Sequence, residues 1–159
     1  MIHLVLVAPE IHWNTGNLGR TALALDATLH LVAPLGFSLD DKHLRRAGLD
    51  YWPRVRLELW RDWAHFEAAL PSLGKPHFFS AEATRLHWDV SYPEQTVLIF
   101  GSESVGLPAT LRAAHRQDLV RIPMHDPELR SLNLSTAAAV VGYEVARQHA
   151  VTKPRRQES

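Results

Sequence analysis

The stretch HLVLVAPEIHWNTGNLGR, residues 3–20, gives the clearest indication of the fold class. Its first part, His3 to Ala8, is an apolar, β-branched run that is typical of a buried strand. Gly16 to Thr28 then spaces Leu18, Ala22 and Leu25 so that all three fall on one face of a helix. A buried strand followed by an amphipathic helix indicates the α/β class, in which parallel strands alternate with helices.

The rest of the chain repeats this alternation with short connections. We expect further strands at Leu29–Ala33, Arg54–Trp60 (an edge strand), His77–Ser80, Thr96–Gly101 and Leu119–Ile122. We expect further helices opening at Asp40–Asp41, over Asp62–Leu70 with Pro71 ending it, over Pro108–His115, and over Ser135–His149 with Ser135 as N-cap. The pattern predicts a parallel sheet with helices on both faces. It also predicts one domain over residues 1–150 and a polar, basic tail over 151–159.

Composition narrows the class of protein. The chain has 159 residues, no cysteine and a formal net charge of zero. Disulfides, Cys-ligated zinc and thiol catalysis are therefore excluded. No apolar run is long enough to span a bilayer and no signal peptide opens the chain, so we expect a cytoplasmic protein. The ten histidines lack the spacing of a helical metal site, and we expect no metal.

Zero net charge does not exclude an RNA partner, because phosphate binding depends on where the charges lie. The basic residues fall in short clusters, which are either RNA contacts or solvated faces. These clusters are Lys42 with Arg45 and Arg46, Arg54 with Arg56, and Lys153 with Arg155 and Arg156.

Ligands of open parallel sheets bind beyond the carboxyl ends of the strands, so the loops after Ala8, Ser80, Phe100 and Ile122 are the candidate site. The first contains Asn14 and Asn17 with two glycines, a composition that predicts exposed backbone amides and an anion site. Its spacing is neither G-x-G-x-x-G nor a P-loop. Arg20, further along, is either a surface charge or part of that site.

The two later loops carry weaker signals when each is taken alone. After Phe100, Gly101 and Gly106 permit close backbone approach, and the serines between them do not form G-x-S-x-G. After Ile122 comes a long loop that ends in Ser131-Leu132-Asn133-Leu134-Ser135, and long loops in compact domains tend to be functional.

Together the three loops resemble the three motifs of the SPOUT methyltransferases. The matching residues are Asn14-Thr15-Gly16-Asn17-x-x-Arg20, Phe100-Gly101-x-Glu103-x-x-Gly106-Leu107-Pro108, and Ile122-Pro123-Met124 with Arg130-Ser131-x-Asn133-Leu134-Ser135. The segment from Gly36 to Tyr51 is similar to the TrmL subfamily, which 2′-O-methylates the wobble cytidine or uridine of certain tRNAs. The resemblance covers about residues 1–150.

The resemblance implies a deep trefoil knot near the C-terminus, a homodimer with the last helix at its interface, S-adenosylmethionine as cofactor and tRNA as substrate. By position it implies cofactor contacts at Phe79, Gly101, Ile122, Ser131 and Leu132. It further implies tRNA contacts at Arg20, Lys42, Arg45 and Arg46. Asn14, Asn17, Glu103 and Asn133 are implied as supporting residues.

In similar enzymes the arginine matching Arg20 activates the ribose hydroxyl together with RNA phosphate and the serine matching Ser131. A guanidinium is effectively always protonated, so an equally sound role for Arg20 is to grip phosphate and orient the ribose. The chain departs from the subfamily at His12-Trp13, Gly19 and Val105. Trp13 would offer a stacking surface for a base.

Three alternatives stay open at this point. The chain could methylate rRNA or another tRNA position, it could be a knotted RNA-binding module without catalysis, or it could be a plain flavodoxin-like or Rossmann domain. The third lacks a phosphate-binding fingerprint to support it.

Overall fold

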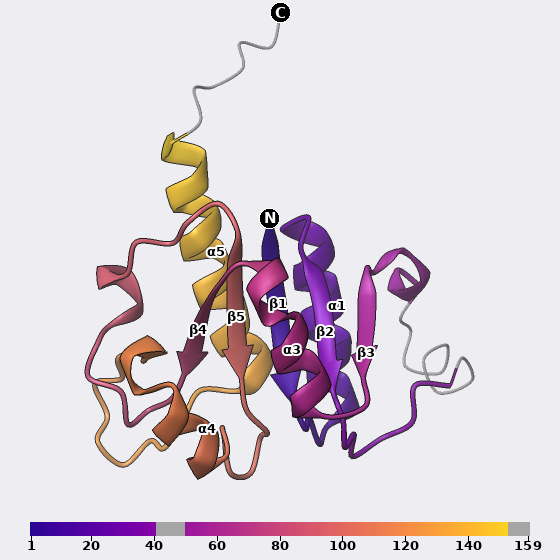
Figure 1. Ribbon diagram of the computed structural model, residues 1–159, viewed down its shortest axis with the longest axis horizontal. Helices are drawn as coiled ribbons and strands as arrows, with labels where there is room; N and C mark the ends of the chain where they lie inside the picture. Colours follow the sequence, from indigo (N-terminus) through magenta and orange to yellow (C-terminus); the bar gives the residue numbers. More distant parts are fainter. Residues whose placement is uncertain (41–49, 153–159) are drawn as a thin grey trace, which may run out of the picture.

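The computed structural model describes residues 1–40 and 50–152. Six parallel strands form one sheet in the order β3-β2-β1-β5-β4-β6 (Figure 1). Their bounds are β1 Ile2–Val7, β2 Thr28–Val32, β3 Leu57–Trp60, β4 Lys75–Phe79, β5 Thr96–Phe100 and β6 Leu119–Val120. The predicted parallel α/β sheet is confirmed, with β3 at its edge as expected.

Helices cover both faces of the sheet. On one face lie α1 (His12–Ala24) and α5 (Leu134–Thr152); on the other lie α3 (Trp63–Leu73) and the short α4 (Ala109–Ala114) (Figure 1). Three 3-10 turns connect these elements: η1 Trp52–Arg54, η2 His87–Asp89 and η3 Arg116–Asp118.

The central strands build two cores because both their faces are covered. In β1, Leu4 and Leu6 pack in the core under α1 and α5, whereas Val5 and Val7 pack in the core under α3 and α4. All six residues of β1 are buried. This burial explains why the strand appears in sequence as an unbroken apolar run rather than an alternating one.

The chain moves outward from β1 to β2 and β3, then crosses to the other side of β1 to form β4, β5 and β6. The direction in which the chain adds strands to the sheet therefore reverses between β1 and β5. These two strands pair directly from Ile2↔Thr96 to Leu6↔Phe100. In parallel sheets the carboxyl ends at such a point form a crevice for a ligand. The loops after β1, β4, β5 and β6 all leave the sheet at this end, the lower end in Figure 1.

Several predicted helix boundaries were wrong. Helix α1 begins at His12 instead of Gly16, so Asn14 and Asn17 lie inside it and not in a preceding loop. Helix α3 continues past Pro71 to Leu73; the proline removes one N–H near the end, where the loss affects only the last turn.

Helix α5 also differs at both ends from its prediction. It begins at Leu134, and Asn133 is its N-cap in place of Ser135, since Asn133 Oδ1 accepts from the Ser135 and Thr136 N–H groups at 3.0 and 3.2 Å. It ends at Thr152, two residues into the predicted tail. The predicted helix at Asp40–Asp41 falls mostly outside the described residues. Within residues 1–40 and 50–152, no helix combines the length and apolarity needed to cross a membrane.

Candidate functional site

A cavity of about 650 Å³ opens at the carboxyl end of the sheet. Its walls come from the start of α1, the loop after β4, the loop between β5 and α4, and the segment between β6 and α5. These are the loops that the strand order brings together. The main lining residues are Ile11, Asn14, Phe79–Glu82, Phe100–Leu107, Arg112, Ile122, Met124, Arg130–Leu134 and Ala137.

The loop after β5 is a tight turn that needs its two glycines. A Cβ placed on Gly101 would lie 1.9 Å from the carbonyl carbon of Gly106, so no larger residue fits. Gly106 itself has a φ of 68°, in the left-handed region that favours glycine. Ser102 and Gly106 exchange backbone hydrogen bonds of 3.2 and 2.9 Å across the turn. The turn therefore presents a short, fixed stretch of backbone to the cavity.

A chain of side-chain hydrogen bonds joins three of the four walls. Asn133 Nδ2 donates to Asn14 Oδ1 at 2.9 Å, and Asn14 Nδ2 donates to Glu103 Oε1 at 3.1 Å. Asn14 is only 1% exposed, so its amide has little access to water. Three residues expected as supporting groups, each from a different part of the chain, are thus joined by hydrogen bonds.

Two carboxylates tie the first loop to the loop after β5. Glu103 accepts from the backbone N–H groups of Glu10 and Ile11 at 2.7 and 3.1 Å, at the positive N-terminal end of α1. In the reverse direction, Glu10 accepts from the N–H and the hydroxyl of Ser104 at 2.8 and 2.7 Å. Glu103 therefore binds two of the amides at this end of α1. The predicted tight turn with exposed amides was wrong, because Asn14 to Gly19 lie inside α1.

The residues expected to hold the cofactor come together. Phe79, Gly101, Ile122, Ser131 and Leu132 all line the cavity, although they belong to three separate segments. The Phe79 and Phe100 rings stack with centroids 4.7 Å apart at the end of β4 and β5. These two rings give the cavity an apolar surface where the strands end.

Arg20 and Asn17 lie outside the cavity on the exposed side of α1. The Arg20 guanidinium carbon stands 4.7 Å from the centre of the Tyr51 ring, a cation–π contact. Tyr51 is itself buried and donates its hydroxyl to the Gly16 carbonyl at 2.7 Å. The role of Tyr51 as a support for Arg20 was not predicted, because a tyrosine gives no sign in the sequence of which distant residue it will pack against.

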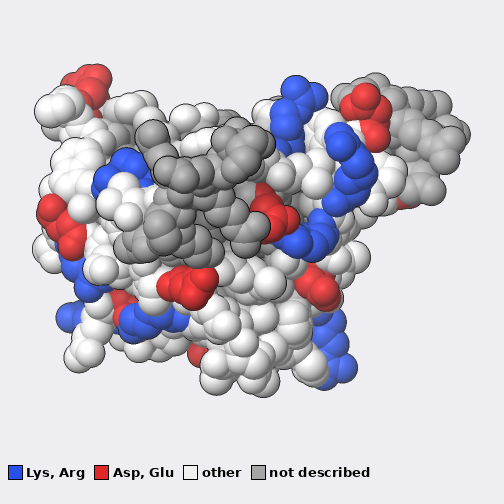
Figure 2. Space-filling view, turned by 90° about the horizontal axis from the view of Figure 1, so that it is seen from above, with Lys and Arg blue, Asp and Glu red and all other residues white. Residues whose placement is uncertain are grey.

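The other expected tRNA contacts, Lys42, Arg45 and Arg46, lie outside the described residues. Of the remaining clusters, Arg54 and Arg56 are exposed, and Arg56 pairs with Asp26 at 2.7 Å. Viewed from the amino end of the strands, opposite the cavity, acidic and basic side chains are interspersed (Figure 2). That end of the molecule is not a uniformly basic surface.

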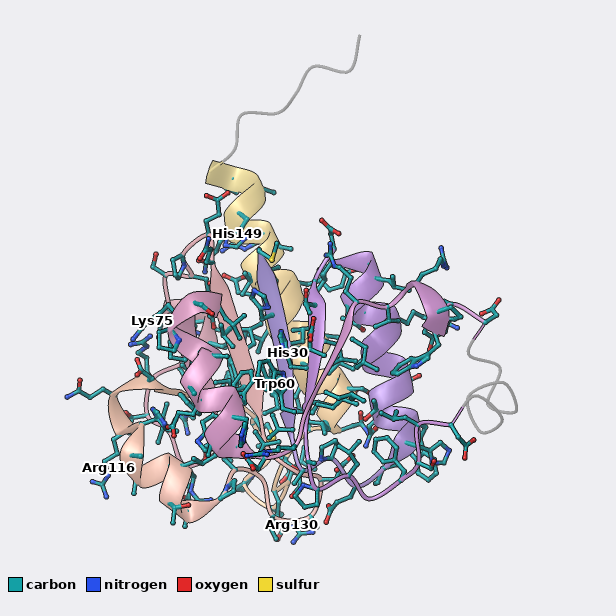
Figure 3. The ribbon with its side chains drawn as sticks, turned by 45° about the vertical axis from the view of Figure 1, so that its right-hand side comes forward. His30, Trp60, Lys75, Arg116, Arg130 and His149 are labelled. Carbon is teal, nitrogen blue, oxygen red and sulfur yellow. The ribbon has the colours of Figure 1, made fainter. Side chains whose placement is uncertain are left out.

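Three charged residues of the cavity wall were not singled out as site residues from the sequence. Arg112 and Glu82 form an ion pair there, with Arg112 Nε 3.1 Å from Glu82 Oε2. Arg130 lies at the same end of the molecule, at the lower edge of Figure 3. Their positions in a short helix and in irregular loops have no periodicity from which a common site could be predicted.

The buried histidines lie apart from the cavity. Trp60 Nε1 donates to His30 Nδ1 at 3.0 Å, and His30 Nε2 contacts His3 Nδ1 at 2.9 Å, between the sheet and α3 (Figure 3). Burial lowers the pKa of His30 to about 4 and also lowers the pKa of His3. Burial likewise lowers the pKa of His77, under Tyr92, to about 4. Nowhere in the described part of the chain do three or more metal-ligating side chains gather.

This geometry defines an α/β protein with a small-molecule site at the point where the strand order of a parallel sheet reverses. The chain belongs to the SpoU rRNA methylase family, which it matches over residues 1–143. It is 44% identical over 150 residues to the tRNA (cytidine(34)-2′-O)-methyltransferase of Burkholderia cenocepacia, covering 93% of this chain and 96% of that one. The resemblance inferred from the motifs is confirmed.

Solved structures agree with this assignment. One, described as giving structural insights into the 2-OH methylation of C/U34 on tRNA, superposes with a TM-score of 0.87 at 46% identity and covers 95% of this chain and 97% of that chain. The SpoU methyltransferase AviRb of Streptomyces viridochromogenes, in complex with AdoMet, shares the fold with a TM-score of 0.80 at 22% identity; it covers 95% of this chain and 58% of that one.

Proposed function

We propose that this protein transfers a methyl group from S-adenosylmethionine to the ribose 2′-hydroxyl of the wobble nucleotide, cytidine or uridine 34, of certain tRNAs. One observation carries the proposal: five residues assigned to the cofactor from the motifs line one cavity, at the end of the sheet where such ligands bind. The relatives of similar length that act on nucleotide 34 of tRNA support the choice of substrate.

The cavity suits the cofactor. Its volume of about 650 Å³ lies within the range of small-molecule sites, roughly 300–1,000 Å³. Phe79, Ile122 and Leu132 offer apolar surface to an adenine ring, and the Gly101–Gly106 turn offers backbone groups to its polar edge. S-adenosylmethionine, when bound, supplies an electrophilic methyl group on a sulfonium.

The chain's own residues position the RNA. A guanidinium stays protonated, so Arg20 acts by gripping a phosphate and orienting the ribose. Arg20 follows Asn14 by six residues, about 9 Å along the helix axis, so RNA reaching from Arg20 to the cavity crosses the first turns of α1. Ser131, which lines the cavity, hydrogen-bonds the ribose hydroxyl in this proposal. Trp13, 59% exposed beside the cavity residue Asn14, offers a base a stacking surface.

The wider tRNA contact is part of the same proposal. Lys42, Arg45 and Arg46 bind phosphates of the tRNA, in keeping with the resemblance that their segment carries. Because such contacts release counterions, the affinity for tRNA should fall steeply as salt rises, despite the zero net charge.

We further propose that residues 1–150 form one catalytic domain that acts in the cytoplasm and contains a deep trefoil knot. The knot is supported by contacts that the segment between β6 and α5 makes with earlier parts of the chain. The segment 85–87 bonds to Arg121 by Arg121 N–H to Arg85 O and by His87 N–H to Arg121 O, both 2.9 Å, and the chain then returns to contact Asn14 through Asn133. The knot is tested by tracing the chain in a crystallographic electron-density map. Residues 121–133 should pass through a loop formed by an earlier part of the chain.

A homodimer with α5 at its interface completes the proposal. Val140, Tyr143 and Val151 are 40%, 56% and 76% exposed on that helix, while Ala138, Val141 and Val145 face the core. Exposed apolar side chains on one helix are typical of an interface. We expect sedimentation at micromolar concentration to show a dimer of the 17.9 kDa chain; a purely monomeric species would contradict the dimer.

The activity is tested with S-adenosylmethionine carrying a labelled methyl group. The protein is incubated separately with bulk tRNA and with rRNA, and the labelled RNA is digested and mapped. We expect label in tRNA at nucleotide 34. Label in rRNA or at another tRNA position would overturn the substrate, and tRNA binding without any transfer would favour a non-catalytic module.

A further inference from the structure

The ion pair on the cavity wall has no part in the function proposed above. Arg112 belongs to α4 and Glu82 to the loop after β4, so the pair spans two walls of the same cavity. Ion pairs with one well-exposed partner contribute little to stability, about 0–1 kcal/mol. Stability alone is therefore a weak reason for a charged pair at this place.

Arg112 is held in place and still has donors to offer. Its Nη1 donates to the Leu107 carbonyl at 2.6 Å, and its Nε faces Glu82. A guanidinium carries five N–H donors, so these two contacts leave other donors for a ligand. The Arg112 side chain is 25% exposed and that of Glu82 is 71% exposed, so the pair is accessible from the cavity.

We propose that Arg112 and Glu82 bind the amino-acid end of S-adenosylmethionine, an inference that rests on the proposed function. That end carries an α-carboxylate and an α-ammonium on the same carbon, which are opposite charges side by side. A fixed Arg–Glu pair offers the complementary charges at the same spacing: Arg112 donates to the carboxylate, and Glu82 accepts from the ammonium. The adenosine end remains on Phe79, Gly101 and Ile122.

Arg130 is the other cation of the cavity wall that could take the carboxylate. Arg112 fits better because its two contacts already restrict the side chain, so less conformational entropy is lost when the ligand binds. Arg112 also has a carboxylate beside it for the ammonium, whereas in the described part of the chain no acidic group lies within ion-pair distance of Arg130.

Two ligands distinguish binding of the amino-acid end of the cofactor from binding of its adenosine end. S-adenosylhomocysteine carries the amino-acid end, and 5′-methylthioadenosine has the same adenosine and thioether without it. Calorimetric titration of Arg112→Leu should show at least about a tenfold loss of affinity for S-adenosylhomocysteine, as expected for a lost charge-assisted hydrogen bond. Its affinity for 5′-methylthioadenosine should stay within about twofold of the wild-type value.

Matched variants complete the test. Glu82→Gln, at an exposed position that costs the fold little, should also weaken only S-adenosylhomocysteine. Arg116→Leu, four residues after Arg112 and pointing away from the cavity (Figure 3), should change neither affinity.

The inference is overturned if Arg112→Leu binds S-adenosylhomocysteine normally or weakens both ligands equally. It is also overturned if Arg130→Leu alone produces the selective loss. A wild-type protein that binds neither ligand would overturn the proposed cofactor as well. A selective loss in Arg112→Leu together with no methylation of tRNA would uphold the inference and count against the substrate alone.

Discussion

At the scale of single residues, the candidate site separates into groups that line the cavity and groups that lie outside it. Ser131 and the residues assigned to the cofactor line it, whereas Arg20 lies on the outer side of α1 above Tyr51. Tyr51 is fixed by its bond to the Gly16 carbonyl and so limits the freedom of the Arg20 side chain. A pre-oriented guanidinium outside the cavity suits a phosphate contact better than a cofactor contact.

Arg20→Ala should therefore leave folding and S-adenosylhomocysteine affinity near normal while methyl transfer falls by at least about a hundredfold. Arg20→Lys tests the geometry of the contact, because lysine neutralises phosphate but cannot make the planar two-pronged bond. If that bond matters most, Lys should be nearly as poor as Ala in single-turnover assays. Arg116→Ala serves as the control. Wild-type turnover in Arg20→Ala, or a loss explained by failure to bind cofactor, would contradict this role.

At the scale of elements, the site depends on how α1 begins. The sequence contained the right residues, since Asn14, Glu103 and Asn133 were all selected from their motifs and all meet. It did not reveal that α1 begins at His12, because the first turn of α1 is stabilised by Glu103 from a loop some ninety residues away. A long-range carboxylate at a helix N-terminus leaves no local signal.

Gly19 is a second position whose residue type depends on a contact far along the chain. A larger apolar residue is usual here in the subfamily, and the sequence gives no reason for the glycine. In the structure a Cβ at Gly19 would lie 2.6 Å from the Trp52 ring, so Trp52 occupies the space. The compensating residue is more than thirty positions away and belongs to a different element.

Asn14→Asp is expected to destabilise the protein by about 2–3 kcal/mol at neutral pH. The substitution removes the donor to Glu103 and places a carboxylate at a buried position, about 3.1 Å from the half-buried Glu103 carboxylate. Urea unfolding would measure the loss, which should shrink as the pH falls and one carboxyl takes up a proton. Asn17→Asp, exposed on the same helix, should change stability by less than about 0.5 kcal/mol. Equal stability of the two variants would show that the hydrogen-bond chain does not support the fold.

At the scale of the whole molecule, the parallel sheet and its covering helices were predictable, because strands buried on both faces appear as apolar runs. The strand order was not, since it depends on which strands pair across the full length of the chain. The order is nonetheless what creates the site: it places the loops after β1, β4, β5 and β6 around one cavity.

The buried histidines should make stability depend on pH. The pKa values of His30 and His77 are lowered to about 4 by burial, so these groups are neutral when folded but take up protons near pH 6.5 when unfolded. The unfolded state binds more protons between these values, so stability is complete above about pH 6.5 and falls as the pH drops toward 4. By about pH 4 each histidine should lower the free energy of unfolding by on the order of 3 kcal/mol relative to neutral pH.

Urea midpoints measured from pH 7.5 to 4.5 should fall steadily below about pH 6.5. His77→Phe should flatten that slope, whereas substitution of the exposed His125 should leave it unchanged. Midpoints that stay constant over this range, or a slope unaffected by His77→Phe, would show that these histidines are not neutral in the folded state.

The central claim is that the acceptor is the ribose hydroxyl of nucleotide 34. The most direct measurement compares two otherwise identical substrate tRNAs, one with the ordinary ribose at position 34 and one with a single 2′-deoxy nucleotide there, each incubated with labelled S-adenosylmethionine. We expect one methyl group per molecule of the first tRNA and none on the second, with similar binding of both. Equal labelling of the two tRNAs would contradict the ribose hydroxyl of nucleotide 34 as acceptor, because the methyl group would then have another acceptor.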